Sequence, residues 1–240
     1  VKKAFLAAED HRFYDHYGVD PRAIIRATWA NITGTFGEQG GSTITQQLAK
    51  NAFLTSEKSM IRKIQEAFLA IQIERHYTKE EILGMYLNWV YFGEGAHGIE
   101  AAALTYFGKG ATQLELAEAA LLAGLLQAPS QYSPYQNEEV ALNRRNTILD
   151  LMERYGFASN ESTEQAKNEP IELSMAAVDE TDAPKYPHPH FVDYVTDLLV
   201  DEYGESMVFQ EGLRVYTTID RNVQQAAEDA LADSSNYPAT

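Results

Sequence analysis

Apolar residues recur every three or four positions through most of residues 1–155, and no other feature of the sequence constrains the fold as strongly. Two segments show the pattern clearly: Ile61, Ile64, Phe68 and Ile71 in the first, and Leu114, Ala117, Leu121 and Leu125 in the second. This spacing gathers side chains on one face of an α-helix. The sequence therefore predicts a mainly α unit, in which the apolar stripe of residues 61–71 faces the core.

The charge of the chain changes after residue 150. Residues 1–150 carry 17 acidic and 14 basic residues, whereas residues 151–240 carry 18 acidic and 5 basic residues. Such an asymmetry indicates two units. We expect residues 1–155 to form the first domain and residues 156–240 to form a small acidic α+β linker region.

Three patterns subdivide this acidic region. Residues 157–188 are polar and contain three prolines, which is typical of a linker. Apolar spacing predicts helices over residues 191–199 and 222–232. Between these helices, Leu213, Val215, Thr217 and Ile219 alternate with Arg214, Tyr216 and Thr218, which predicts a strand.

The composition excludes several functional classes. Cysteine is absent, so disulfides and thiolate metal sites are excluded. A net charge of -16 makes nucleic acid an unfavourable partner. No apolar run is long enough to span a bilayer. The chain opens inside a helical pattern without a signal peptide or an initiator methionine, so we expect it to be a piece of a longer protein.

Glu9 is the first candidate for chemistry, because a continuous helix would place its carboxylate on an apolar face. That face comprises Phe5, Leu6, Phe13 and His16. Desolvation raises the pKa of a carboxyl group, which suits a general base or acid near neutral pH. The alternative is that Glu9 pairs with Arg12 or His16, or simply closes the helix.

The segment Gly40–Gln47 is the second candidate. Two glycines are followed by Thr43 and Gln46 at the spacing of a capping box, which predicts a helix start with exposed amide groups. Such a helix end suits a phosphate or a sugar. The nucleotide-binding phosphate loop is absent from the sequence. An ordinary helix start remains the alternative.

A cluster of cations around one carboxylate is the third candidate. Lys58, Arg62 and Glu66 recur every four residues, with Lys63 beside them and Lys50 upstream. Charge-assisted bonds from such a cluster would hold a pyrophosphate leaving group. The alternative is a solvated helix face with weak ion pairs.

The stretch from Ile24 to Phe36 is the fourth candidate. Its apolar residues alternate with Arg22 and Arg26, a composition that fits a segment lying in a membrane interface. Core packing is the alternative explanation.

In this order and spacing, the segments resemble the family 51 peptidoglycan glycosyltransferases, specifically the N-terminal half of class A penicillin-binding proteins. Five motifs carry the resemblance, and they lie at residues 9–18, 41–47, 62–66, 79–88 and 144–149. The resemblance covers residues 1 to about 155. One departure is Gly84, where the family usually has a glutamate.

The resemblance implies a mainly α, lysozyme-like glycosyltransferase domain that polymerises lipid II into glycan strands with inversion. Glu9 would be the catalytic base. Glu66, the second catalytic residue, would lie beside the departing pyrophosphate and orient cationic partners or a divalent metal. No cofactor is obligatory, although Mg²⁺ or Mn²⁺ near Glu66 is compatible with the pattern.

The resemblance also implies a set of substrate-binding residues that bind the sugar or phosphates or hold the site in shape. The set comprises Asp10, Phe13, His16, Gly41, Ser42, Thr43, Gln46, Gln47, Lys50, Lys58, Arg62, Lys63, Tyr86, Asn88 and Arg145.

The expected partners are lipid II, the growing glycan strand, the membrane interface, and proteins of cell-wall synthesis and division. The expected location is the outer face of the bacterial cytoplasmic membrane, with an N-terminal anchoring helix outside this sequence. Residues 212–220 resemble the strand that leads into a transpeptidase domain. The Ser-x-x-Lys and Lys-Thr-Gly motifs of that second enzyme do not occur in this sequence.

Two other functions are considered. A lysozyme-like glycan-cleaving enzyme would also use a glutamate, but a neutral glycan has no pyrophosphate for the cations to stabilise. A non-catalytic scaffold for lipid or cell wall would have no need of both Glu9 and Glu66.

Overall fold

A computed structural model describes residues 1–26, 41–53, 60–174, 188–203, 208, 213 and 215–232. The chain forms two compact units, Val1–Val178 and Asp179–Thr240. The described residues form helices and no strand, with only two isolated β-bridges, Tyr17 to Val19 and Tyr91 to His97. The mainly α prediction is therefore confirmed for this part of the chain.

The helices of the first unit follow one another through short loops. They are α1 (Lys2–Glu9), α3 (Ile44–Phe53), α4 (Met60–His76), α5 (Lys79–Trp89), α6 (Ile99–Phe107), the 3₁₀ turn η1 (Ala111–Gln113), α7 (Leu116–Leu125), α8 (Pro129–Tyr132), α9 (Glu138–Arg154) and α10 (Asn160–Lys167). Residues 21–26 are also helical.

Helix α7 forms the centre of the first unit. Eight of its ten residues are buried, as expected for a helix that is apolar on all sides. It packs against α1, α8, α9 and α10. A Cβ atom at Gly124 would come within 2.9 Å of Cγ of Arg144 on α9, so the glycine permits the close approach of these two helices.

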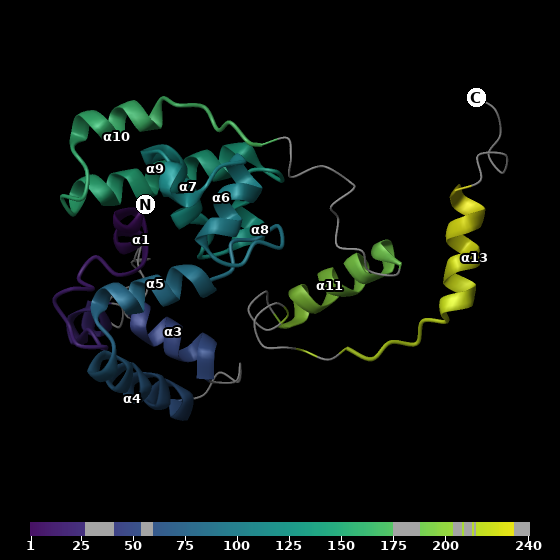
Figure 1. The fold of residues 1–240 in the computed structure, drawn as a ribbon, viewed down its shortest axis with the longest axis horizontal. Coiled ribbons are helices and arrows are strands. Elements are labelled where there is room, and N and C mark those ends of the chain that lie inside the picture. The colour runs from purple at the N-terminus through teal and green to yellow at the C-terminus, as the bar shows by residue number, and fades with distance from the viewer. Residues whose placement is uncertain are drawn as a thin grey trace. The chain divides into compact units, whose positions relative to one another are not determined.

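Helices α3, α4 and α5 form the other end of the unit, with α1 between the two ends (Figure 1). Glu74 of α4 joins all three helices. Its Oε1 accepts a hydrogen bond from Oγ1 of Thr45 on α3 at 2.7 Å and another from Nζ of Lys79 on α5 at 2.7 Å. The Lys79 ammonium also lies 4.3 Å from the ring centroid of Phe13, which ties the loop after α1 to this group.

The orientation of α4 contradicts the sequence prediction. Ile61, Ile64 and Phe68 are 70%, 68% and 61% exposed, so this stripe faces outward. The inward face instead carries Glu66, Ala70, Ile73 and Glu74. Periodicity identifies the two faces of a helix but not the one that is buried, and here ion pairs and hydrogen bonds satisfy the inward carboxylates.

The first helix is also shorter than predicted. It ends at Glu9, because the backbone of Asp10, with φ -158° and ψ 74°, leaves the helical region. Phe13 and His16 therefore lie in turns rather than on a continuation of the helical face of Glu9.

The acidic region is more helical than the sequence indicated. Helix α10 lies within the segment that was expected to be a linker, and its Thr163 and Ala166 are buried. The two later helices are confirmed as α11 (Pro189–Tyr203) and α13 (Arg221–Ala232). The strand predicted over residues 213–219 is wrong for its described residues, 213 and 215–219, which have no strand partner in the described chain.

Gly18 gives a direct test of how the loop after α1 packs. Its φ is +80°, and a Cβ atom would lie 2.8 Å from the backbone C and O atoms of Ala70 on α4. We expect Gly18→Ala to lower the free energy of unfolding by about 2 to 4 kcal/mol, from backbone strain and overpacking together. Denaturant unfolding measures this loss.

Gly156→Ala is the matched control for Gly18→Ala. Its φ is +72°, but no atom lies within 4 Å of the added Cβ. The control should lose only about 1 to 2 kcal/mol, from backbone strain alone. Equal losses at the two positions would contradict the close packing at Gly18.

Candidate active site

Glu9 is held at the end of α1 by a hydrogen-bonded chain from two other helices. Nε2 of Gln47 on α3 donates to Oε2 of Glu9 at 2.8 Å. The hydroxyl of Tyr86 on α5 donates to Oε1 of Gln47 at 3.2 Å. Three helices therefore fix the orientation of one carboxylate.

The surroundings of Glu9 raise the pKa of its carboxyl group. Desolvation is the largest cause, and the charge of Asp10 acts in the same direction. The hydrogen bond from Gln47 and the charges of Arg144 and Lys50 lower the pKa and partly oppose that rise. A carboxylate with a raised pKa is suited to accept a proton near neutral pH.

The pairing of Glu9 with Arg12 or His16 does not occur. Arg12 Nη1 lies 3.1 Å from Oδ1 of Asp20, and His16 Nε2 lies 2.8 Å from Oδ2 of Asp10. No ion pair joins Glu9 to another side chain in the described ranges. The carboxylate is left with the Gln47 amide as its hydrogen-bond partner.

The start of α3 follows the predicted capping box but is not open to a ligand. The amide of Gln46 donates to Thr43 Oγ1 at 3.1 Å, and the amide of Thr43 donates to Gln46 Oε1 at 3.0 Å. The amide of Ile44 donates to Asp10 Oδ2 at 3.1 Å. The expectation of exposed amides is therefore wrong, because the side chain of Asp10 already occupies this helix end.

Glu66 of α4 forms the centre of a second cluster, which reaches the start of α3 through Lys63 and Ser42. Its side chain is 2% exposed and lies 2.6 Å from Lys63 Nζ and 3.2 Å from Arg62 Nε. Lys63 Nζ also donates to the hydroxyl of Ser42 at 2.7 Å. Because the Lys63 side chain is 49% exposed, its ammonium stays accessible to an anionic ligand while Glu66 fixes its position.

The surroundings of Glu66 do not fit a divalent metal. Two cationic side chains already neutralise its carboxylate, and a metal would have to displace them. No group of three His, Asp or Glu side chains that could hold a metal occurs among the described residues. The site has the donors for an anion rather than for a cation.

The structure brings together most of the predicted site residues. Asp10, Phe13, Thr43, Gln46 and Tyr86 are buried. Gly41, Ser42, Gln47 and Lys50 are partly exposed around it. Lys58 lies outside the described residues, as does most of the membrane-interface stretch from Ile24 to Phe36.

Asn88 and Arg145 are not placed against Glu9. Asn88 is exposed near the end of α5. The guanidinium of Arg145 is buried and donates to the backbone oxygens of Glu169 at 2.6 Å and Lys167 at 2.8 Å. Arg145 therefore anchors the segment after α10.

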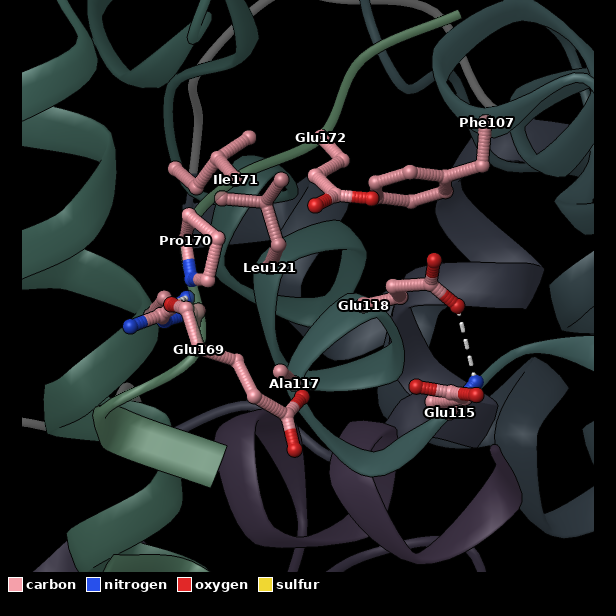
Figure 2. Close-up of a pocket in the computed structure, with 10 residues that line it drawn as sticks. Phe107, Glu115, Ala117, Glu118, Leu121, Glu169, Pro170, Ile171 and Glu172 are labelled. Carbon is pink, nitrogen blue, oxygen red and sulfur yellow. Dashed lines mark hydrogen bonds between the residues drawn. The ribbon is translucent and has the colours of Figure 1, made fainter. Parts of the chain in front are cut away.

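Arg145 borders a pocket that is separate from the Glu9 site, and it is the only predicted site residue there. Figure 2 shows its lining: Phe107, Glu115, Ala117, Glu118, Leu121, Glu169, Pro170, Ile171 and Glu172. Four carboxylates around one pocket repel an anionic substrate. An anion suits the Ser42 and Lys63 region, which carries cationic side chains, better than this pocket.

Sequence reasoning missed Arg144, the neighbour of Arg145. The charge of Arg144 acts on Glu9 more strongly than that of Lys50. The fifth motif contains both arginines, but a linear sequence does not show which of two adjacent helical side chains has a charge that acts on Glu9.

Residues 1–153 match the transglycosylase family. The chain belongs to this family. The sequence is 46% identical over 234 residues to penicillin-binding protein 1A of Aquifex aeolicus, covering 97% of this chain and 31% of that protein. It is 44% identical over 232 residues to penicillin-binding protein 1A of Escherichia coli, covering 97% of this chain and 27% of that protein.

A solved structure also matches this transglycosylase. It is penicillin-binding protein 1A from Haemophilus influenzae, with 31% sequence identity, a TM-score of 0.40, and coverage of 77% of this chain and 24% of that one. The present chain spans between 27% and 31% of the two curated relatives named above. The resemblance found from the five motifs is confirmed by the family match and these relatives.

Within the described parts of the chain, every helix is too short or too polar to cross a bilayer.

Asp10 should contribute measurably to stability through the α3 cap. Asp10→Asn removes the negative charge that the helix N-terminus stabilises, so we expect a loss of about 1 to 2 kcal/mol in the free energy of unfolding. Denaturant unfolding measures the difference.

Asp15→Asn is the control for Asp10→Asn. The Asp15 side chain is 67% exposed and lies 3.7 Å from Arg12 Nε. Its replacement should change stability by less than about 0.5 kcal/mol. If both variants lost the same amount, the capping role of Asp10 would be refuted.

Proposed function

We propose that this chain is a peptidoglycan glycosyltransferase domain that polymerises lipid II into glycan strands. One observation carries the proposal: two groups from other helices contact residues at the start of α3. Glu9 of α1, a carboxylate with a raised pKa, contacts Gln47, and Lys63 of α4, an accessible ammonium, contacts Ser42. The first group suits proton abstraction and the second suits an anionic leaving group. Membership of the transglycosylase family supports the same reaction class.

The proposed reaction is a single displacement at the donor sugar. Glu9 takes the proton from the 4-hydroxyl of the acceptor GlcNAc, and the resulting oxygen attacks the anomeric carbon of the growing chain. The bond from that carbon to the pyrophosphate breaks, and the pyrophosphate leaves with the electron pair. Attack from the opposite side inverts the anomeric configuration.

The cluster around Glu66 would stabilise the leaving group. Lys63 and Arg62 place positive charge where the pyrophosphate oxygens become more negative. Glu66 itself is buried, so it acts by fixing the two cations rather than by contacting the sugar. Ser42 adds a hydroxyl next to Lys63.

The two other functions are less well supported. A glycan-cleaving enzyme has no anionic leaving group, so it has no use for Lys63 and Arg62. A non-catalytic scaffold does not explain a carboxylate held by Gln47 and Tyr86. A Cβ atom added at Gly84 meets no atom within 4 Å, so no close packing depends on this glycine.

A lipid-linked substrate requires the enzyme to work at a bilayer surface. The outward stripe of α4, formed by Ile61, Ile64 and Phe68, supports membrane contact because exposed apolar side chains gain by entering the interface. The proposal therefore includes the outer face of the cytoplasmic membrane as the location. Lipid II and the glycan strand are the proposed partners, together with proteins of cell-wall synthesis and division.

Glu9→Gln tests the catalytic assignment. The amide cannot accept the acceptor proton, so we expect the rate of lipid II polymerisation to fall by about a hundredfold to ten-thousandfold. A gel assay with labelled lipid II in detergent measures the polymer. The exposed Glu139→Gln is the control and should retain full activity. Activity of Glu9→Gln at the level of the control would refute the assignment.

The outward stripe of α4 can be tested separately from catalysis. We expect the double variant Ile64→Ser and Phe68→Ser to bind vesicles of anionic phospholipid about tenfold more weakly or worse, because two apolar side chains no longer enter the interface. Co-sedimentation measures binding. Gln65→Ser, at an exposed position on the same helix, is the control. Unchanged vesicle binding by the double variant would show that the stripe does not contact lipid.

A further inference from the structure

The pocket bordered by Arg145 has no part in the reaction proposed above, and its size limits what it can hold. Its volume is about 160 Å³. Sites that enclose a whole small ligand measure about 300 to 1,000 Å³. This pocket therefore has room for one side chain rather than for a nucleotide or a complete cofactor.

The segment after α10 lines the pocket and is fixed at both ends. At its start, Arg145 donates to the backbone oxygen of Glu169 at 2.6 Å. At its end, the amide of Ser174 donates to the backbone oxygen of Tyr106 on α6 at 2.8 Å. Residues 169–172, which line the pocket, are held between these two bonds. A pocket that is formed in advance loses little conformational entropy when it is filled.

Part of the pocket wall is apolar. Leu121 of α7 is buried there, whereas Pro170 and Ile171 line the pocket and keep surface that is accessible to solvent. Figure 2 shows these three side chains together. Apolar surface gains free energy when an occupant covers it. The wall therefore favours an occupant with an aliphatic portion.

The rest of the wall carries a surplus of negative charge. Four glutamates line the pocket, and two cations oppose them: Arg145, which also lines it, and Lys109, which pairs with Glu118 at 2.8 Å. The carboxylates of Glu169 and Glu172 form no ion pair and accept no hydrogen bond in the part of the chain that the structure describes. These two carboxylates can therefore bind a cation from outside the chain.

An aromatic ring completes the wall. Figure 2 shows the ring of Phe107 on the same side of the pocket as the carboxylates of Glu118 and Glu172. A guanidinium stacks on an aromatic face and donates paired N–H groups to a carboxylate. The wall thus offers both kinds of contact that an arginine side chain makes.

We propose that this pocket is a docking site for a basic side chain, foremost an arginine, of a partner protein. The aliphatic stem of that side chain would cover Leu121 and Ile171. Its guanidinium would bind the Phe107 ring and the free carboxylates of Glu169 and Glu172. The proposal concerns recognition of a partner and is independent of the glycosyl transfer at Glu9.

Two other occupants fit the pocket less well. A second copy of this chain is repelled, because each copy carries a net charge of -16. The same charge attracts a basic partner. A free polyamine would bind the carboxylates but would leave the accessible surface of Pro170 uncovered. A protein surface that presents one basic side chain satisfies both parts of the wall.

The first experiment is an NMR titration of the protein with a blocked pentapeptide that carries one central arginine between apolar residues. We expect shifts at the backbone amides of Phe107, Leu121 and Ile171, which line the pocket. A peptide with citrulline in place of the arginine keeps the shape but has no charge. It should bind about tenfold more weakly or worse, because a charge-assisted bond is lost.

A pair of double variants tests the carboxylates. Glu169→Gln with Glu172→Gln should weaken binding of the arginine peptide by about tenfold, since both free carboxylates are removed. Glu138→Gln with Glu139→Gln removes the same charge from two exposed positions on α9 and should stay within about twofold of the wild type. Thermal unfolding confirms that each variant is folded.

The proposal is overturned if the citrulline peptide binds as tightly as the arginine peptide, if the shifts lie away from the pocket, or if the Glu169 and Glu172 double variant keeps wild-type affinity. Binding of spermine in the pocket as tightly as the arginine peptide would instead assign a free amine. A wild-type dimer that this double variant dissociates in sedimentation would assign a second copy. Lipid II polymerisation by the double variant should equal that of the wild type, so this test and that of Glu9 fail separately.

Discussion

The carboxylate of Asp10 is the contact on which the site depends. One oxygen, Oδ2, receives the amide of Ile44 at the start of α3 and lies 2.8 Å from His16 Nε2. The charge of an anion at a helix N-terminus is favourable, so this contact fixes where α3 begins relative to the end of α1. That placement brings Gln47, one turn into α3, to Glu9. Glu9, the proposed base, is therefore positioned by its neighbour in the sequence acting through a second helix.

The sequence predicted much of this site, because its parts are local. The capping box of Thr43 and Gln46, the raised pKa of Glu9 and the pairing of Glu66 with nearby cations all follow from short-range spacing. The partners of Asp10 could not be predicted, since Ile44 lies 34 residues away and the contact exists only after α3 has packed. The backbone contacts of Arg145 could not be predicted either, since Lys167 and Glu169 lie 22 and 24 residues away.

The fold shows a second limit of sequence patterns. Helical periodicity was correct over α4, but the assumption that the apolar stripe is buried was wrong. The inward face holds Glu66 and Glu74, whose charges are compensated by Lys63 and Lys79. A helix can bury its carboxylates when cations are supplied by its own turns or by a neighbouring helix. The apolar side is then free for a surface role.

The Tyr86–Gln47 hydrogen bond has a stereochemical consequence for the base. Burial and the charges of Glu9 and Asp10 raise the pKa of Tyr86 well above its ordinary value, so its hydroxyl stays protonated and remains a donor. The amide oxygen of Gln47 must face that hydroxyl, and its NH₂ group must face Glu9. Oε2 of Glu9 accepts this hydrogen bond, so under the proposed function Oε1 is the more available oxygen for the acceptor proton. A carboxylate that is symmetric in solution thus becomes one with two distinguishable oxygens, one of which is tied to α3.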